Sequence, residues 1–183
     1  MEKPNEAVLT IDWVYTTIMS SDFDLVTPIW LDITGVCGAN GSEVSVPEGT
    51  TFAFNMEPSW NATVSGDIVL VGNHLHDGGV DLDVKKNNET VCSGIANYGE
   101  SPGYLEPMNM DQSHHHNNID EMVMEHISSI TKCLDIGTVK LGDTWSITAQ
   151  YNLTAHPTMM EQDGKLAPVM GITLLYIADR KAG

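Results

Sequence analysis

The stretch GNHLHDGGV, residues 72–80, combines a strand pattern, two histidines and a glycine turn. It follows the run IVLV at 68–71, whose β-branched residues predict a buried strand. Side chains on a strand alternate between its faces, so His74 and His76 point the same way with their imidazoles close together. This spacing predicts a two-histidine metal clamp in which Asp77 orients one ring. The alternative interpretation is a pair of histidines on a half-exposed strand that holds no metal.

The composition predicts a single acidic domain. With 183 residues, of which 42% are hydrophobic, the chain is long enough for one well-packed core and too short for two domains of ordinary size. Only 8 Lys and Arg stand against 25 Asp and Glu, which gives a net charge of −17. This charge argues against nucleic acid and anionic lipid as partners. No apolar run is long enough for a membrane-spanning helix.

Four sequons for N-glycosylation favour a secreted protein. They begin at Asn40, Asn61, Asn88 and Asn152. The first residues lack the basic and apolar regions of a signal peptide. We therefore expect a secreted glycoprotein whose signal peptide is absent from this sequence.

Three cysteines agree only partly with secretion, because a disulfide framework uses an even number. Cys92 and Cys133 both lie near the ends of predicted strands and could pair with each other. That pairing would leave Cys37 free, buried or bound elsewhere. Spacing alone does not fix the connectivity.

Alternating and β-branched segments predict roughly nine or ten short strands, and no amphipathic helix is evident. The segments are 8–19, 28–34, 50–55, 68–71, 80–84, 90–92, 126–130, 138–141, 145–151 and 169–177. The polar residues 85–89 join two of these segments into a hairpin. The expected fold is an all-β antiparallel sandwich of jelly-roll type, formed as one domain over residues 1–183.

A change of composition marks residues 98–125, where Gly, Pro, Asn, Asp and Met dominate. We predict a long loop, or a short helix within a loop, that is poorly packed and dispensable for folding. The run His114-His115-His116 lies in its middle. Adjacent residues of a regular element cannot all aim at one point, so we interpret this run as a mobile surface tract that binds metal loosely at most.

Further candidate ligands are two histidines and three methionines, namely His126, His156, Met159, Met160 and Met170. Met170 stands out because it opens the last predicted core strand directly after a loop. At that position its thioether could project toward a neighbouring strand. The alternative is that Met170 is ordinary core filling.

The order of these residues resembles the second copper domain of peptidylglycine α-hydroxylating monooxygenase. It looks closer still to uncharacterised secreted fungal proteins with a His-x-His-Asp-Gly-Gly motif and to plant stress-upregulated nodulin-type proteins. The similarity spans roughly residues 28–177. The matching features are His74-x-His76, Cys92, Tyr98-Gly99, Ile127 with Cys133, Gly142-Asp143, Tyr151, His156, and Met170-Gly171-Ile172 with Tyr176.

This resemblance implies that His74, His76 and Met170 bind one copper ion, and that Cys92 and Cys133 form a disulfide. Two imidazoles and a thioether suit Cu(I), whereas zinc rarely takes methionine. An open coordination position would then be available to oxygen or peroxide. If His126 or His156 filled that position instead, the closed site would point to storage or a structural role.

The departures from the monooxygenase limit what the resemblance implies. That enzyme has a preceding domain in which three histidines hold a second copper, and this sequence leaves no room for it. The tract 114–116 does not replace it, because it lies in a loop of the same domain. The residues that bind the peptide substrate are not recognisable either, so peptide amidation is not expected.

Three functional hypotheses follow. The first is a secreted mononuclear copper protein with a monooxygenase-like domain, which acts as an oxidoreductase supplied by an external reductant. The second is a non-catalytic protein that binds or buffers copper. The third is a sandwich whose metal site is purely structural. The sequence identifies neither a catalytic residue nor a substrate.

Overall fold

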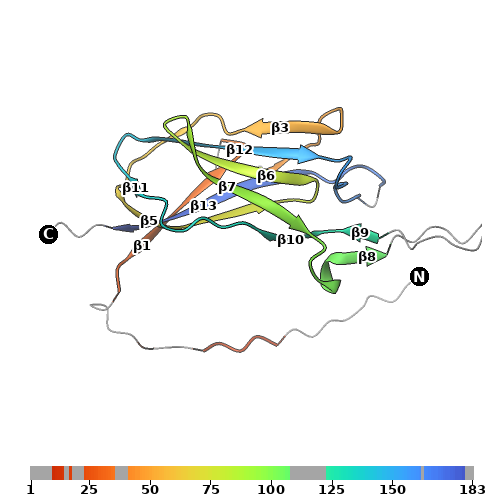
Figure 1. Ribbon diagram of the computed structural model, residues 1–183, viewed down its shortest axis with the longest axis horizontal. Coiled ribbons are helices and arrows are strands. Elements are labelled where there is room, and N and C mark those ends of the chain that lie inside the picture. The colour runs from red at the N-terminus through yellow and green to blue at the C-terminus, as the bar shows by residue number, and fades with distance from the viewer. Residues whose placement is uncertain are drawn as a thin grey trace, which may run out of the picture.

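The computed structural model describes residues 10–14, 17, 23–35, 41–107, 123–161 and 163–179. Within these ranges the chain forms thirteen strands and one short 3₁₀ turn at Pro102–Tyr104, with no α-helix. Two antiparallel sheets stack face to face, and a small ribbon extends from one end (Figure 1). The structure confirms the predicted all-β antiparallel sandwich. None of the described residues forms a helix that could span a bilayer.

The first sheet has the order β1-β13-β5-β11, with β2 also pairing with β13. Its strands are β1 (Val26–Asp32), β2 (Glu43–Val44), β5 (Gly66–Leu75), β11 (Thr138–Val139) and β13 (Val169–Asp179). The second sheet has the order β10-β7-β6-β12-β3, with β4 also pairing with β12. Its strands are β3 (Thr51–Asn55), β4 (Trp60–Asn61), β6 (Gly79–Lys86), β7 (Glu89–Tyr98), β10 (Ile127–Ile130) and β12 (Thr144–Asn152).

Alternation along the strands places the core between the two sheets. Val71 and Leu175 from the first sheet and Val84, Trp145 and Ile147 from the second are each 0% exposed. Burying one side chain of this kind contributes about 1.5 to 3 kcal/mol to folding. The predicted hairpin is also confirmed, since β6 and β7 pair directly around a two-residue turn. Both turn residues are asparagines with positive φ, the conformation that a tight hairpin turn requires.

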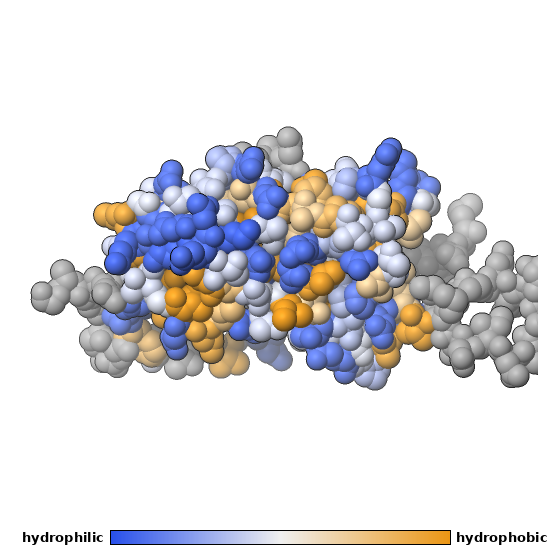
Figure 2. All heavy atoms as spheres, turned by 45° about the horizontal axis from the view of Figure 1, so that its top comes forward, coloured by the Kyte–Doolittle hydropathy of each residue, from blue (hydrophilic) through white to orange (hydrophobic). Residues whose placement is uncertain are grey.

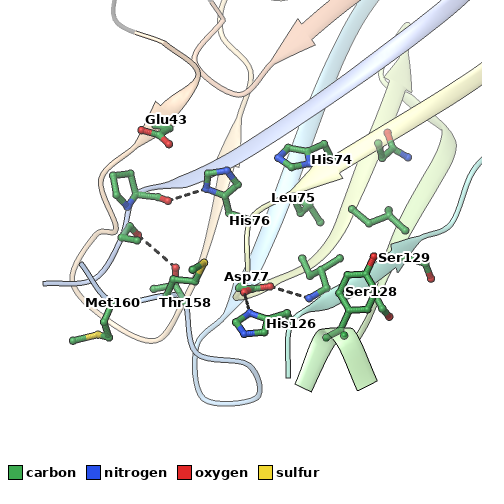
Figure 3. A pocket seen from close by; sticks show the side chains of 18 of the residues that line it. Glu43, His74, Leu75, His76, Asp77, His126, Ser128, Ser129, Thr158 and Met160 are labelled. Atoms are coloured by element: carbon green, nitrogen blue, oxygen red, sulfur yellow. Dashed lines mark hydrogen bonds and ion pairs between the residues drawn. The ribbon is translucent and has the colours of Figure 1, made fainter. Parts of the chain in front are cut away.

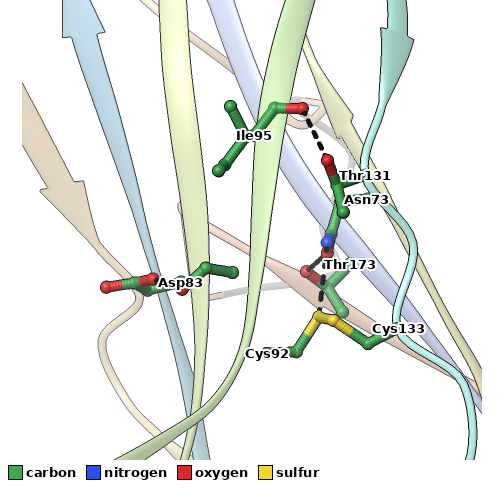
Figure 4. Close-up of a disulfide and its surroundings, with 8 residues drawn as sticks. Asn73, Asp83, Cys92, Ile95, Thr131, Cys133 and Thr173 are labelled. Carbon is green, nitrogen blue, oxygen red and sulfur yellow. Dashed lines mark hydrogen bonds between the residues drawn. A yellow bond between two sulfur atoms is a disulfide. The ribbon is translucent and has the colours of Figure 1, made fainter.

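A disulfide ties the two sheets together, as the resemblance implied (Figure 4). Cys92 lies on β7, whereas Cys133 forms an isolated bridge with Val71 of β5. The two cysteines are 41 residues apart in sequence, and closing a loop of that length stabilises a fold by about 4 kcal/mol on the chain-entropy estimate. Asn73 of β5 also contacts the disulfide, because its side-chain amide donates to Cys92 Sγ at 3.8 Å. Cys37 lies outside the described residues.

Two of the predicted elements differ from the structure. The strand expected over residues 8–19 is wrong for its described part, because residues 10–14 belong to no sheet and the side chain of Val14 is 90% exposed. A β-branched pattern forms a strand only where a neighbouring strand pairs with it. The loop expected over residues 98–125 also contains regular structure. Its ends pair as the ribbon β8 (Leu105–Pro107) and β9 (Val123–Glu125), while 108–122, with the triple histidine, lie outside the described residues.

The outer face of the second sheet carries paired polar side chains. The Asp81 carboxylate accepts from the Gln150 amide at 3.0 Å, and Lys85 donates to the Thr148 hydroxyl at 3.2 Å. Figure 2 turns this side of the molecule forward and shows hydrophilic side chains spread among smaller hydrophobic patches. This face is therefore solvated, and the candidate site lies elsewhere.

Candidate metal centre

His74 and His76 lie at the end of β5 and face the same side of the first sheet. Their ring centroids are 5.4 Å apart and the rings are nearly perpendicular. His74 lies opposite Ile172 of β13, and its side chain is exposed. Figure 3 shows both imidazoles beside the same cavity. The two imidazoles therefore lie close together as predicted, and their role as metal ligands stays a prediction.

A backbone carbonyl fixes the tautomer of His76. The Nδ1 atom lies 3.0 Å from the carbonyl oxygen of Pro168. A carbonyl can only accept, so Nδ1 carries the hydrogen, and Nε2 of the neutral ring keeps a free lone pair. Metal-binding histidines in proteins are commonly oriented in this way, with one nitrogen donating to a carbonyl or carboxylate. Nε2 is thus the nitrogen of His76 that could bind a metal.

Met170 lies directly across from His76. The His76 N–H donates to the Met170 carbonyl at 3.0 Å, and the Tyr151 hydroxyl donates to the same carbonyl at 2.8 Å. These bonds place Met170 one step beyond the paired residues Gly171 and Leu75, on the strand face that also carries Ile172. Its side chain lines a hollow of about 370 Å³ together with His74. The fold therefore brings all three predicted ligands to one face.

In the described parts of the chain, His, Cys, Asp and Glu alone form no group of three that could hold a metal ion. Met170, which shares a hollow with His74, is the methionine that the resemblance implies as a third ligand. Met159 and Met160 line the neighbouring cavity, and their side chains are 52% and 56% exposed.

The surroundings of His74 favour its metal-binding form. Partial desolvation, followed by the proximity of His76, lowers the pKa of His74 below its usual value of 6.5. Both effects disfavour the charged ring. Because metals bind neutral imidazole, a lowered pKa keeps this ligand available at and below neutral pH.

Asp77 orients a histidine, but not one of the clamp. Its Oδ2 accepts from His126 Nδ1 at 2.6 Å, and its Oδ1 accepts from the Ile127 N–H at 2.9 Å. The Asp77 side chain is only 9% exposed. The hydrogen bond with Asp77 is the largest of the effects that raise the pKa of His126. Sequence reasoning missed this pair, because its members are 49 residues apart and no motif links them.

His156 supports the turn that follows the clamp. Its ring stacks on Tyr98 with centroids 3.6 Å apart and planes at 4°. The Tyr98 hydroxyl accepts from the Gly78 N–H at 3.0 Å and donates to the Gly79 carbonyl at 2.7 Å. His156 and Tyr98 therefore brace the turn from the β7 side, and the structure gives His156 a packing contact there.

A cavity of about 840 Å³ adjoins the clamp. His74, His76, Asp77 and His126 line one part of it. The remaining lining residues are mostly apolar or small, and include Tyr104, Ile127, Ile130, Met159, Met160, Thr158, Ala167 and Pro168. A molecule bound there would lie beside the His74–His76 pair and the His126–Asp77 pair. The volume of the cavity is within the range of small-molecule sites in proteins, which is about 300 to 1,000 Å³.

Comparison with known proteins relates the chain to proteins named for copper-dependent chemistry. The chain is homologous to fungal proteins named as probable copper-dependent oxygenases. It is 33% identical over 172 residues to probable copper-dependent oxygenase M1 of a Phoma species, and 34% identical over 170 residues to probable copper-dependent oxygenase clz3 of Cochliobolus lunatus. These matches cover 94% and 93% of this chain.

The same matches cover only 39% and 48% of the two oxygenases, so the chain spans less than half the length of each. No protein-family model matches the chain. No solved structure matches it either. The relationship to the oxygenases therefore rests on sequence identity over nearly the whole of this chain.

Proposed function

We propose that this chain is the copper-binding domain of a copper-dependent oxygenase. One observation carries the proposal: the hydrogen bond from His76 Nδ1 to the Pro168 carbonyl, which leaves Nε2 free on the face shared with His74 and Met170. In this proposal the two imidazoles and the thioether bind one copper ion. The names of the two homologous oxygenases support copper as the metal.

The donor set suits a copper that changes oxidation state. Imidazole binds both Cu(I) and Cu(II), while the soft thioether favours Cu(I). Bound copper would carry electrons from an external reductant to dioxygen or peroxide. Desolvation lowers the pKa of His74, which favours its neutral, metal-binding form, and the Pro168 carbonyl orients the ring of His76.

The surroundings of Met170 support a site open to other molecules. The hollow that Met170 shares with His74 is also lined by Trp30, Leu174 and Tyr176. Trp30 is 47% exposed on this face. An apolar border of this kind limits water near the metal without closing the remaining coordination position to oxygen.

We also propose that the protein is secreted and glycosylated. Of the four sequon asparagines, Asn61 and Asn88 are exposed and Asn152 is partly exposed. Asn40 lies outside the described residues. A disulfide between the sheets suits an oxidising compartment. Mass analysis of protein from a eukaryotic secretory host would test this, and unmodified Asn61 and Asn88 would contradict it.

Copper titration tests the main proposal. The variant His114→Ala/His115→Ala/His116→Ala should be used, because the triple histidine can bind copper on its own. We expect it to take up one equivalent of copper and, with ascorbate and oxygen, to release hydrogen peroxide. No stoichiometric uptake would overturn the copper site. Uptake without peroxide formation or substrate oxidation would favour a binding or buffering protein.

A further inference from the structure

His126 is held so that one ring nitrogen faces the cavity. Its Nδ1 donates to the buried Asp77 carboxylate at 2.6 Å, and the same carboxylate accepts from the Ile127 N–H. The His126 side chain is 21% exposed and lines the cavity beside the clamp. Asp77 therefore fixes the ring through Nδ1, and Nε2 is the nitrogen that remains for a second partner.

A carboxylate of the chain itself already stands at this nitrogen. Glu106 Oε2 of the β8 strand lies 3.3 Å from His126 Nε2. Both ring nitrogens thus meet carboxylates, which only accept, so the ring carries both hydrogens and a positive charge. The Glu106 side chain is 67% exposed, and the contact is longer than an ordinary charged hydrogen bond. An exposed pair of this kind is weak and readily exchanged for another carboxylate.

The other charges of the cavity are separated between its walls. His126 and Lys132 flank β10, whereas Glu43 comes from β2 and Glu161 from the segment before β13. Figure 3 shows Glu43 and His126 on either side of His76. Asp77 offsets the charge of His126 on the β10 wall, but Lys132 leaves that wall more positive than the Glu43 wall, so a negative group in the cavity is attracted to it. The apolar side chains between them accommodate a hydrocarbon body.

We propose that His126 anchors the carboxylate of an organic-acid substrate, which displaces Glu106 and places its apolar body beside the copper ligands. The substrate class is thus an amphiphilic carboxylic acid. Asp77 acts as the positioning residue for this anchor. The role as a substrate site rests on the proposed copper function, while the carboxylate site itself does not require the metal.

Binding of octanoate and its neutral analogue octanamide tests the proposal. Calorimetry on the full chain, first without copper and then with one equivalent, would give both affinities. We expect octanoate to bind about tenfold more tightly than octanamide, since a hydrogen bond to a charged group accounts for that ratio. Glu106→Gln should raise the octanoate affinity about two- to fivefold, because it removes a weak competing pair. It should leave octanamide binding unchanged.

Two further variants complete the test. His126→Gln should abolish the preference for octanoate. Glu89→Gln removes an exposed carboxylate at the hairpin, far from this cavity in the fold, and should change neither affinity. Equal binding of octanoate and octanamide by both the unmodified chain and Glu106→Gln would overturn the inference, as would a preference that survives in His126→Gln.

Copper titration of the same samples separates the two proposals. Copper uptake without any octanoate preference would overturn the anchor and leave the copper site standing. A His126-dependent preference without copper uptake would support the carboxylate site and overturn the copper function.

Discussion

His76 and His126 both line the cavity that Asp77 also lines, yet their ring nitrogens have different hydrogen-bond partners. His76 Nδ1 donates to a neutral carbonyl, that of Pro168, so its other nitrogen keeps a lone pair for a metal. His126 Nδ1 donates to a carboxylate, which stabilises the charged ring. Asp77 and Glu106 together favour a charged His126 ring, whereas the Pro168 carbonyl leaves the second nitrogen of His76 to the proposed metal.

The largest effect should come from breaking the Cys92–Cys133 disulfide, which links the sheet that carries His76 to the sheet that carries the β10 wall. Cys92→Ser removes the link between β7, which contacts the β10 wall, and the sheet that carries the clamp. We expect the free energy of unfolding to fall by about 2 to 5 kcal/mol. Chemical denaturation under oxidising conditions would measure it. A change below about 1 kcal/mol would mean that packing alone holds the two sheets in register.

Exchanging the histidines for alanine should separate their roles. His76→Ala is expected to weaken copper binding by more than the roughly 10- to 100-fold typical of losing an outer partner of a metal ligand. His126→Ala should leave the copper stoichiometry unchanged. Met170→Ala should weaken Cu(I) more than Cu(II), because the lost thioether is a soft ligand. Competition titrations with Cu(I) and Cu(II) would measure these affinities. Loss of copper binding in the His126→Ala variant would contradict the separate roles of His76 and His126.

A smaller effect is expected at the turn between the two regions. Tyr98→Phe keeps the stack on His156 but loses the hydroxyl bonds to Gly78 and Gly79. Each such bond contributes about 0.5 to 1.5 kcal/mol, so the variant should lose about 1 to 3 kcal/mol of stability. Thermal unfolding of Tyr98→Phe would measure this loss, and His156→Ala, which removes only the ring stack, would serve as the comparison. Equal stability of Tyr98→Phe and the unmodified chain would show that the turn needs no support from β7.

The smallest effect should appear as opposite pH dependences. The pKa of His126 is raised in the fold, so its stabilising contribution is complete below the unfolded value of 6.5 and is lost as pH rises through the folded value. The pKa of His74 is lowered, so copper binding should persist below pH 6.5 and weaken as pH falls through the lowered value, where the ring becomes protonated. Unfolding of the copper-free chain between pH 5 and 8 would reveal the first slope. His126→Gln should abolish it, and an unchanged slope would contradict the assignment.

Much of the fold was predictable because its signals are local. Alternation along residues 80–84 and the polar turn at 85–89 specify a hairpin without any knowledge of distant residues. The clamp was predictable for the same reason, since His74 and His76 are two positions apart on one strand. The exposed residues 10–14 show the limit of this reasoning, because a strand pattern does not supply a partner strand.

The rest of the site depends on pairings between distant segments. Met170 meets His76 only through the register of β13 against β5, and the resemblance to a copper domain, rather than spacing, pointed to it. His126 meets Asp77 through the packing of β10 beside the clamp turn. Neither contact leaves a local pattern in the sequence. The role expected for Asp77 was therefore right in kind and wrong in its partner.

X-ray absorption spectroscopy of the Cu(I)-loaded chain tests the central claim most directly. The variant with His114, His115 and His116 changed to alanine should be loaded with one equivalent, so that the triple histidine does not contribute to the spectrum. We predict two imidazole nitrogens and one sulfur around copper, with the sulfur lost in an additional Met170→Ala change. A spectrum with nitrogen or oxygen ligands alone, or one that His76→Ala leaves unaltered, would contradict the proposed copper centre.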